Sequence, residues 1–297
     1  MLKNLLGRLI AAIRKLLMKH EIQPTPDPEP DQPRDVEYVA KYPSAPGLST
    51  YENKNVLIDY SNVAEGYVFI TYTGEVCQNC KVQIVYGEKE QHFNLPGDGT
   101  QKAFPLCFGD GYYQIDVFRH AFDDNYIKVT KPENFDVIVE LNDPLAPWLY
   151  PNTYADYGPE SECVKLAARL CAGARTYAER VKTVTDYITK KITYDKELAE
   201  RVQTEKWWLP VPDEVIAAGK SICFGFSSLG AGMLRPLGIP TKICVGYTKL
   251  TPGLHAWNEV FIAGAWQILD LTYLAQAGGK ISALFTRENY HTTLYCG

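Results

Sequence analysis

The stretch that decides the fold reads Gly219-Lys220-Ser221-Ile222-Cys223-Phe224-Gly225-Phe226. Two further stretches follow it, His255-Ala256-Trp257-Asn258-Glu259-Val260 and Trp266-Gln267-Ile268-Leu269-Asp270-Leu271-Thr272. One Cys, one His and one Asp therefore follow one another along the chain. A thiol, an imidazole and a carboxylate are the three groups that a cysteine acyl-transfer enzyme uses. The three candidate catalytic residues are Cys223, His255 and Asp270.

The residues after Cys223 predict a helix with the thiol in its first turn. Apolar residues recur about one turn apart as far as Leu237, and Ser221 is a good N-cap. The free backbone N–H groups and the dipole at this end of a helix favour a thiolate, and Lys220 adds a nearby cation. Each glycine in a helix costs about 1 kcal/mol relative to Ala, so the glycines here indicate a helix pressed against a sheet. They are Gly225, Gly230 and Gly232.

A predicted hairpin brings the other two candidates together. Residues 255–262 and 265–272 read as its strands, with the turn at Ala263-Gly264. This register sets Asp270 on the same face as His255 and diagonal to it. Diagonal neighbours lie about 7–8 Å apart, close enough for an imidazole and a carboxylate to meet. The carboxylate can then orient the imidazole, which can accept the thiol proton.

These stretches resemble the transglutaminase-like superfamily, of papain-like fold, in its bacterial branch. Leu237-Gly238-Ile239-Pro240 and Val245-Gly246-Tyr247 belong to the same resemblance, which extends from Ser161 to Tyr273. The fold that it implies for residues 143–297 is a papain-like catalytic domain.

The resemblance also implies a role for each candidate residue. Cys223 would be the nucleophile, His255 the base and Asp270 the orienting carboxylate. The sequence departs from the usual pattern at Ser221, where Gly is common, and at Gly225-Phe226, where an acidic-aromatic pair is common. Neither departure touches the three candidate residues.

Two classes of function remain open. In the first, the thiol attacks an amide carbonyl of a protein or peptide substrate and forms a thioester. Water as acceptor gives a peptidase or amidase, which we expect, and an amine gives a transglutaminase that cross-links Gln to amines. In the second, the domain is catalytically inert and the chain is a membrane-tethered binding or scaffold protein. The sequence presents no ligand set for a metal, and no cofactor is expected.

A side chain upstream of the nucleophile is expected to complete an oxyanion hole together with the backbone N–H of the thiol residue. The candidates are Gln203, Trp207, Trp208 and Tyr194. For the tryptophans, packing against the core or the cleft wall is the favoured alternative.

Residues 1–22 predict a basic amphipathic helix. Leucine and isoleucine fall on one helical stripe, while lysine and arginine occur with no acid before Glu21. The longest apolar run is too short for a membrane span or a signal peptide. One expectation is that residues 1–20 lie on an anionic membrane surface, and the other is that they dock on protein. The absence of signal-like features favours the cytoplasmic side of a membrane.

The rest of the chain predicts an α+β fold with an N-terminal sandwich. Residues 23–50 are rich in Pro and read as an extended linker. Residues 51–142 contain short alternating segments separated by turn signals, which predict an antiparallel β-sandwich of immunoglobulin-like size. Helices are expected at 161–170 and 176–191. The expected strands are 55–60, 67–72, 81–86, 91–95, 112–118, 126–130 and 135–141.

Composition narrows the partners and the compartment. A net charge of −5 and a pI near 5.6 give no reason to expect nucleic acid. The 8 Cys are unevenly spaced, which favours free thiols in a reduced compartment. Cys77 and Cys80 have the spacing of metal ligands, but no second pair follows, so a structural role is favoured over zinc. The sequence does not predict an oligomeric state.

Overall fold

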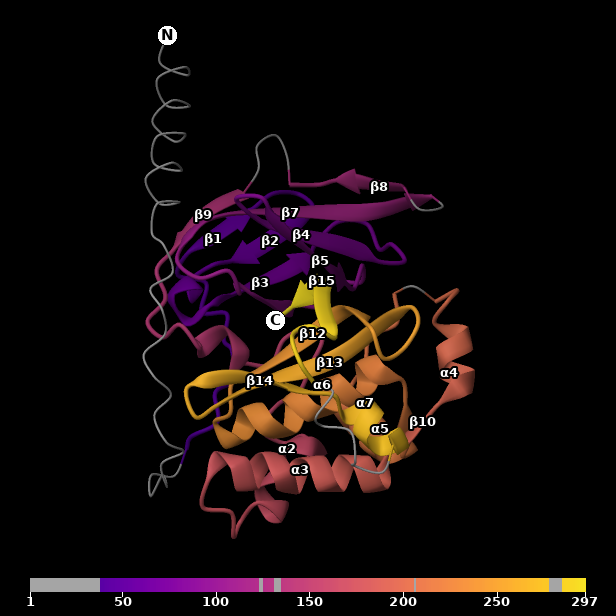
Figure 1. Cartoon of the computed structure of the whole chain (residues 1–297). Helices are drawn as coiled ribbons and strands as arrows, with labels where there is room; N and C mark the ends of the chain where they lie inside the picture. The colour runs from indigo at the N-terminus through magenta and orange to yellow at the C-terminus, as the bar shows by residue number, and fades with distance from the viewer. Residues whose placement is uncertain (1–37, 123–124, 131–134, 206, 278–284) are drawn as a thin grey trace.

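The computed structural model describes residues 38–122, 125–130, 135–205, 207–277 and 285–297 (Figure 1). The helix expected at 1–22 and the first part of the linker expected at 23–50 lie outside these residues. Within the described part of the chain, no helix is both long enough and apolar enough to cross a bilayer.

Two antiparallel sheets occupy the N-terminal half. The first has the strand order β1 (Thr50–Glu52), β2 (Val56–Asp59), β3 (Tyr67–Tyr72), β6 (Lys102–Pro105). The second has the order β5 (Lys89–Leu95), β4 (Cys80–Tyr86), β7 (Gly111–Phe122), β8 (Asn125–Lys128), and β9 (Phe135–Val139) also pairs with β7. A short helix, η1 (Val63–Glu65), precedes β3.

Each of the expected strands is present, and two short ones, β1 and β6, escaped prediction. Buried and less buried residues alternate along β4, where Cys80, Val82 and Ile84 face the core. That alternation is the period-2 pattern on which the prediction rested. The two missed strands have 3 and 4 residues, too few for a period to show.

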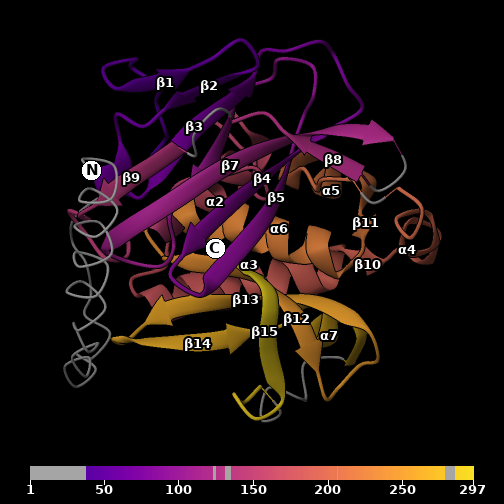
Figure 2. The same cartoon turned by 90° about the horizontal axis from the view of Figure 1, so that it is seen from above.

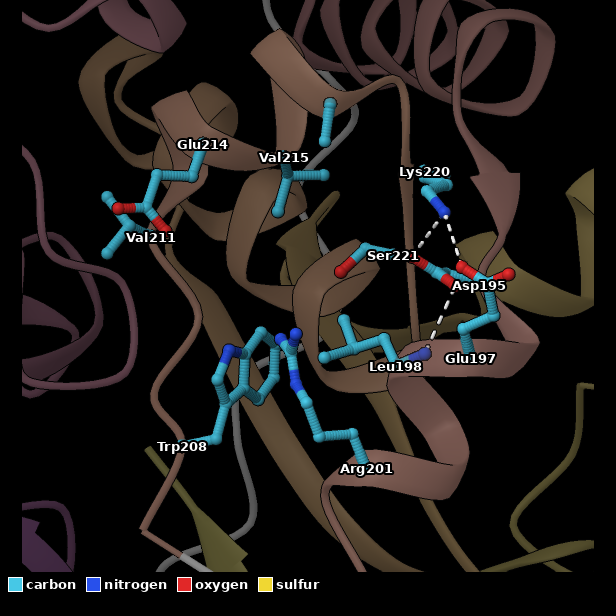
Figure 3. A pocket seen from close by; sticks show the side chains of 11 residues that line it. Asp195, Glu197, Leu198, Arg201, Trp208, Val211, Glu214, Val215, Lys220 and Ser221 are labelled. Carbon is cyan, nitrogen blue, oxygen red and sulfur yellow. Dashed lines mark hydrogen bonds and ion pairs between the residues drawn. The ribbon is translucent and has the colours of Figure 1, made fainter. Parts of the chain in front are cut away.

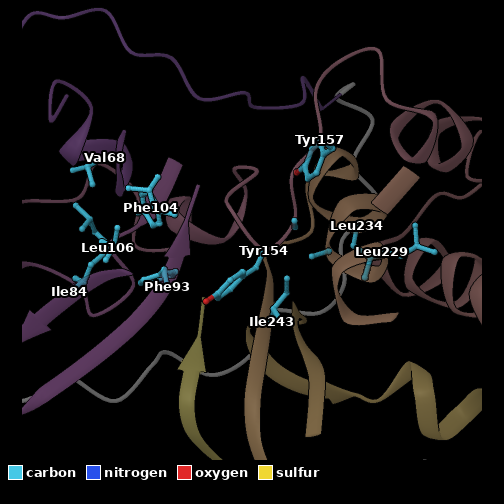
Figure 4. Packing of buried hydrophobic residues seen from close by; sticks show 14 of the residues in the cluster. Val68, Ile84, Phe93, Phe104, Leu106, Tyr154, Tyr157, Leu229, Leu234 and Ile243 are labelled. Carbon is cyan, nitrogen blue, oxygen red and sulfur yellow. The ribbon is translucent and has the colours of Figure 1, made fainter. Parts of the chain in front are cut away.

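One core of buried side chains runs from the N-terminal sheets into the C-terminal half. Phe93 of β5 and Phe104 of β6 pack edge to face, with ring centroids 5.4 Å apart. Tyr154 stacks on Phe93 at 5.6 Å and meets the ring of Phe224 at 5.1 Å. Figure 4 shows Tyr154 between the N-terminal strands and the helical side of the core. The sheets therefore pack directly against the part of the chain that carries the candidate thiol.

The C-terminal half combines helices with a third antiparallel sheet. The helices are η2 (Ala146–Trp148), α2 (Glu162–Leu170), α3 (Tyr177–Lys191), α4 (Lys196–Arg201), α5 (Pro212–Ala218), α6 (Cys223–Leu234), η3 (Arg235–Leu237) and α7 (Leu271–Ala277). The sheet has the order β14 (Ala265–Leu269), β13 (Leu254–Ile262), β12 (Thr241–Thr248), β15 (Tyr290–Cys296). Two short strands, β10 (Thr193–Tyr194) and β11 (Lys220–Ser221), pair in parallel.

These elements stack in layers. Figure 1 shows the N-terminal sheets, then the sheet of β12 to β15, then α6, and last α2 and α3. Seen from above, in Figure 2, β15 lies beside β12, and one of its ends lies next to β5. The helices expected at 161–170 and 176–191 are confirmed as α2 and α3. Thr176 caps α3 in a capping box with Glu179.

Helix α6 begins at Cys223, as predicted, but its N-cap was predicted wrongly. Ile222 occupies the N-cap position and makes no side-chain capping bond. Ser221 belongs instead to β11, where it pairs with Tyr194 of β10. All residues from Gly225 to Leu234 are buried, so α6 is a core helix surrounded by packing partners.

Strand β13 holds α6 through a buried amide. Asn258 Nδ2 donates to Ser227 O of α6 at 2.9 Å and to Lys242 O of β12 at 3.0 Å. A Cβ on Gly230 would lie 2.5 Å from Asn258 Oδ1 and 2.6 Å from Leu271 Cδ1, which explains why this position is glycine. The prediction of a helix pressed against a sheet is therefore confirmed at Gly230.

The predicted hairpin has the predicted register but a shorter second strand. Ile262 pairs with Ala265, and the pairing continues to Asn258 and Leu269. Ala263 and Gly264 have φ of 51° and 74°, as a two-residue turn between antiparallel strands requires. The strand predicted to reach Thr272 ends at Leu269, because the next residues turn into α7.

Substituting Gly230→Ala tests the close approach of α6 to the sheet. Because the new methyl group meets side chains of β13 and α7, we expect the free energy of unfolding to fall by about 1–3 kcal/mol. Urea denaturation followed by circular dichroism measures the change. Gly173→Ala is the matched control, since a Cβ there meets no atom within 4 Å. Equal stability of both variants would contradict the close packing.

Candidate active site

The Cys223 thiol lies at the positive end of a buried helix. Cys223 is the first residue of α6, directly after the extended segment of β11 and Ile222. It is partly exposed, whereas the helix behind it is buried. No acidic residue occupies the first turn of α6. The thiol is therefore accessible at a point where backbone N–H groups can support negative charge.

Strand β13 presents His255 to this thiol. The imidazole is only 6% exposed, and the Cys223 side chain lies close enough to influence its pKa. Its Nε2 lies 2.7 Å from Asp270 Oδ2. Burial lowers the pKa of His255, but the hydrogen bond with Asp270 and the neighbouring Cys223 outweigh burial and raise the pKa to about 10. His255 therefore holds its proton at neutral pH, as an imidazolium paired with the Asp270 carboxylate.

Asp270 is fully buried, and hydrogen bonds hold both of its oxygens. Oδ1 accepts from the backbone N–H of Tyr273 at 2.9 Å, which ties the carboxylate to the first turn of α7. Oδ2 accepts from Tyr290 Oη at 2.9 Å in addition to its bond with His255. The hydrogen bond predicted between His255 and Asp270 is present. The side chain of Tyr290 is a component of the site that sequence reasoning missed.

The cation expected beside the thiol is already engaged. Lys220 Nζ lies 3.2 Å from Asp195 Oδ2 and 3.4 Å from Glu197 Oε2. The parallel pairing of β10 with β11 brings these carboxylates to Lys220. Lys220 is thus a nearby cation, as expected, but its charge is shared with two carboxylates from outside α6, and the helix end and the His255 pair remain as the local supports for a thiolate.

The four upstream candidates for the oxyanion hole differ in position. Tyr194 pairs with Ser221 across the short parallel sheet, and burial and the neighbouring Cys223 raise the pKa of its phenol. The Trp208 ring lies 6.4 Å from that of Phe224. Trp207 and Gln203 are exposed. Tyr194 is thus the candidate with an electrostatic contact to the thiol.

A pocket opens beside β11, between α4 and α5 (Figure 3). Its volume is about 390 Å³. Ser221, only 1% exposed, reaches it from a position two residues before the thiol. Apolar side chains and charges of both signs share its wall, which suits a side chain with an apolar stem and a polar end. The wall consists of Asp195, Glu197, Leu198, Arg201, Trp208, Val211, Glu214, Val215, Ala218, Lys220 and Ser221.

Among the described residues, no three side chains of His, Cys, Asp or Glu are arranged to hold a metal ion. Cys77 Sγ and Cys80 Sγ lie 3.5 Å apart as free thiols, much farther than the roughly 2.05 Å of a disulfide bond.

Comparison with known proteins gives this geometry a context. Residues 164–271 match the model of the transglutaminase-like superfamily. The human kyphoscoliosis peptidase is 27% identical over 132 residues, 41% of this chain and 20% of the relative. The mouse kyphoscoliosis peptidase is 28% identical over 119 residues, 37% of this chain and 18% of the relative. The chain thus spans no more than a fifth of the length of these curated relatives.

A solved structure from Cytophaga hutchinsonii, described as a candidate cysteine protease, is 19% identical to this chain. The similarity covers 78% of this chain and 71% of that one, with a TM-score of 0.40. The family match includes the thiol, the imidazole and the carboxylate, and it ends before the strand that supplies Tyr290.

The raised pKa of His255 predicts how stability changes with pH. The imidazolium is stabilised in the folded chain, so its contribution is complete below the unfolded pKa of 6.5 and is lost as pH rises through about 10. We expect His255→Gln to lower the free energy of unfolding by a few kcal/mol at pH 6, where ~1.4 kcal/mol corresponds to one pKa unit, and by much less at pH 10. Urea denaturation of both proteins at pH 6, 8 and 10 measures this. A difference that does not change with pH would contradict the assigned ion pair.

Proposed function

From the transglutaminase-like segment at residues 164–271, we propose that this chain is a cysteine-dependent acyl-transfer enzyme. The observation that carries the proposal is the arrangement of three side chains. A partly exposed thiol at a helix N-terminus lies close enough to a buried imidazole to raise its pKa, and that imidazole lies 2.7 Å from a fully buried carboxylate. This order of nucleophile, base and orienting group is the one that thiol acyl transfer requires.

In the proposed mechanism, His255 has already taken the thiol proton and is an imidazolium, and the Cys223 thiolate attacks an amide carbonyl. The C–N bond then breaks, His255 gives the proton to the departing amine, and a thioester remains on Cys223. Asp270 keeps the imidazole oriented and stabilises the imidazolium. The backbone N–H of Cys223 and the phenol of Tyr194 would donate to the oxyanion.

The acceptor that resolves the thioester decides the reaction class. We propose water, which makes the chain a peptidase or amidase acting on a protein or peptide substrate. The relatives that match the chain are named peptidases, which supports this choice. The pocket beside β11 would receive a substrate side chain, since it opens two residues before the nucleophile. An amine as acceptor would make the chain a transglutaminase, the alternative reaction of the same thioester.

An assay with fluorescently labelled casein and a dansylated alkylamine separates the two reactions. We expect the chain to release labelled peptides and to attach little amine, because the thioester is resolved by water. Cys223→Ala should reduce peptide release by about 1,000-fold or more. Cys107→Ala, which removes another partly exposed thiol, should leave release unchanged. Attachment of the amine in preference to hydrolysis would assign a transglutaminase, and activity that persists in Cys223→Ala would overturn the proposal.

The N-terminal sheets suggest how substrates are presented. We propose that they form an immunoglobulin-like sandwich that holds a protein substrate or partner next to the catalytic core. The shared packing through Tyr154 supports this, because it fixes the sheets against α6. A scaffold with an inert core would use the same surface, and the casein assay distinguishes that alternative.

We further propose that residues 1–20 bind an anionic membrane surface, a proposal that rests on their basic, amphipathic sequence. Sedimentation with vesicles of phosphatidylserine and phosphatidylcholine should carry down the full chain. A version that starts at Gln23 should remain in the supernatant, and so should the full chain with vesicles of phosphatidylcholine alone. Equal sedimentation of both versions would contradict membrane binding through this segment.

A further inference from the structure

Tyr290 occupies a buried position against the candidate triad. It is the first residue of β15, pairs with Thr248 of β12 and is 4% exposed. Its ring meets that of Trp257 at 5.1 Å and that of Phe285 at 5.9 Å. Its hydroxyl donates to Asp270 Oδ2 at 2.9 Å, the oxygen that also faces His255.

We propose that Tyr290 is a positioning residue, whose hydroxyl holds the Asp270 carboxylate in place against His255. The inference rests on the proposed function and adds a fourth side chain to its machinery. Tyr290 lies beyond the segment that matches the family model, so the C-terminal strand would complete a site otherwise built from residues 164–271.

Burying the carboxylate of Asp270 away from water costs free energy. A buried charge is tolerated when hydrogen bonds and a counter-charge satisfy it. Asp270 is 0% exposed and has donors from three elements, which are His255 on β13, the Tyr273 N–H on α7 and Tyr290 on β15. The backbone donor fixes Oδ1, whereas Oδ2 is shared between the imidazole and the phenol. Without the phenol, Oδ2 has one partner and the carboxylate can turn away from the imidazole.

The phenol of Tyr290 stays protonated, and so remains a hydrogen-bond donor, at neutral pH. Burial and the adjacent Asp270 both raise the pKa of Tyr290 far above neutrality. The ionisable groups around Asp270 are the His255 imidazole, the Cys223 thiol beyond it and the phenols of Tyr273 and Tyr290. The Tyr273 hydroxyl points elsewhere and donates to Leu250 O at 2.8 Å. Only one of the two phenols bonds to the carboxylate.

Packing alone is the competing explanation, since the Tyr290 ring belongs to a cluster with Cys244 and Trp257. Tyr290→Phe keeps the ring and removes only the hydroxyl. Tyr273→Phe is a matched control, because it removes a nearby phenol hydroxyl and leaves the backbone N–H that bonds to Asp270. Both substitutions are made in the full chain.

The first readout is the titration of the His255 imidazole by NMR, which needs no turnover. In Tyr290→Phe, a loosened carboxylate stabilises the imidazolium less, so the titration midpoint should move down by about one pH unit, the effect of losing one hydrogen bond to a charged group. In Tyr273→Phe it should stay at the wild-type value. The second readout is kcat/KM on casein peptides, which should fall about 10-fold in Tyr290→Phe alone.

A merely structural role predicts a different result. Tyr290→Phe would then lower the urea midpoint while leaving the His255 titration and kcat/KM unchanged, and that outcome overturns the proposal. The two proposals fail separately. Absence of turnover in the wild type would refute the proposed function, while the His255 titration would still decide the role of Tyr290.

Discussion

The contact between helix α6 and strand β13 is the constraint on which the candidate site depends. The helix carries Cys223 at its first residue and the strand carries His255, so their packing sets how thiol and imidazole meet. Asn258 fixes that packing by donating to a carbonyl on α6 and to one on β12. Gly230 allows the approach because a side chain there would collide with Asn258. A partly exposed thiol at the N-terminal end of a buried helix is the local result.

A second buried group connects this core to the rest of the chain. The guanidinium of Arg235, which is 0% exposed, donates to three backbone carbonyls from distant segments, at Tyr150, Thr241 and Gly297. These bonds satisfy a charge that would otherwise be costly to bury. They hold the segment around Tyr150, the start of strand β12 and Gly297 together at the C-terminal end of α6. Strand β15, which ends next to that point, is thereby held where Tyr290 reaches the carboxylate.

The sequence predicts the parts of the site that depend on residues close together along the chain, and it misses those that depend on tertiary contacts. The face shared by His255 and Asp270 follows from strand alternation and a two-residue turn, both local and periodic, and it was predicted correctly. The N-cap role of Ser221 was mispredicted, and the carboxylates that pair with Lys220 were not foreseen, because a parallel pairing of two-residue strands decides both. Such short pairings leave no pattern in the sequence. Tyr290 belongs to a tail without clear periodicity, so only tertiary packing reveals its contact. The longer helices α2, α3 and α6 and most strands were predicted for the same reason that the hairpin was, whereas the short helices α4, α5 and α7 were not.

The pH dependence of iodoacetamide labelling at Cys223, followed by mass spectrometry in the wild type and in His255→Ala, tests the central claim most directly. If Cys223 and His255 form a thiolate–imidazolium pair, labelling should be rapid at pH 6, well below the reference thiol pKa of about 8.5. In His255→Ala the labelling rate should fall by on the order of 10-fold or more. Labelling no faster than at Cys107, and unchanged by His255→Ala, would show that the thiol and the imidazole do not act as a pair. The transglutaminase-like fold would then be present without the chemistry proposed for it.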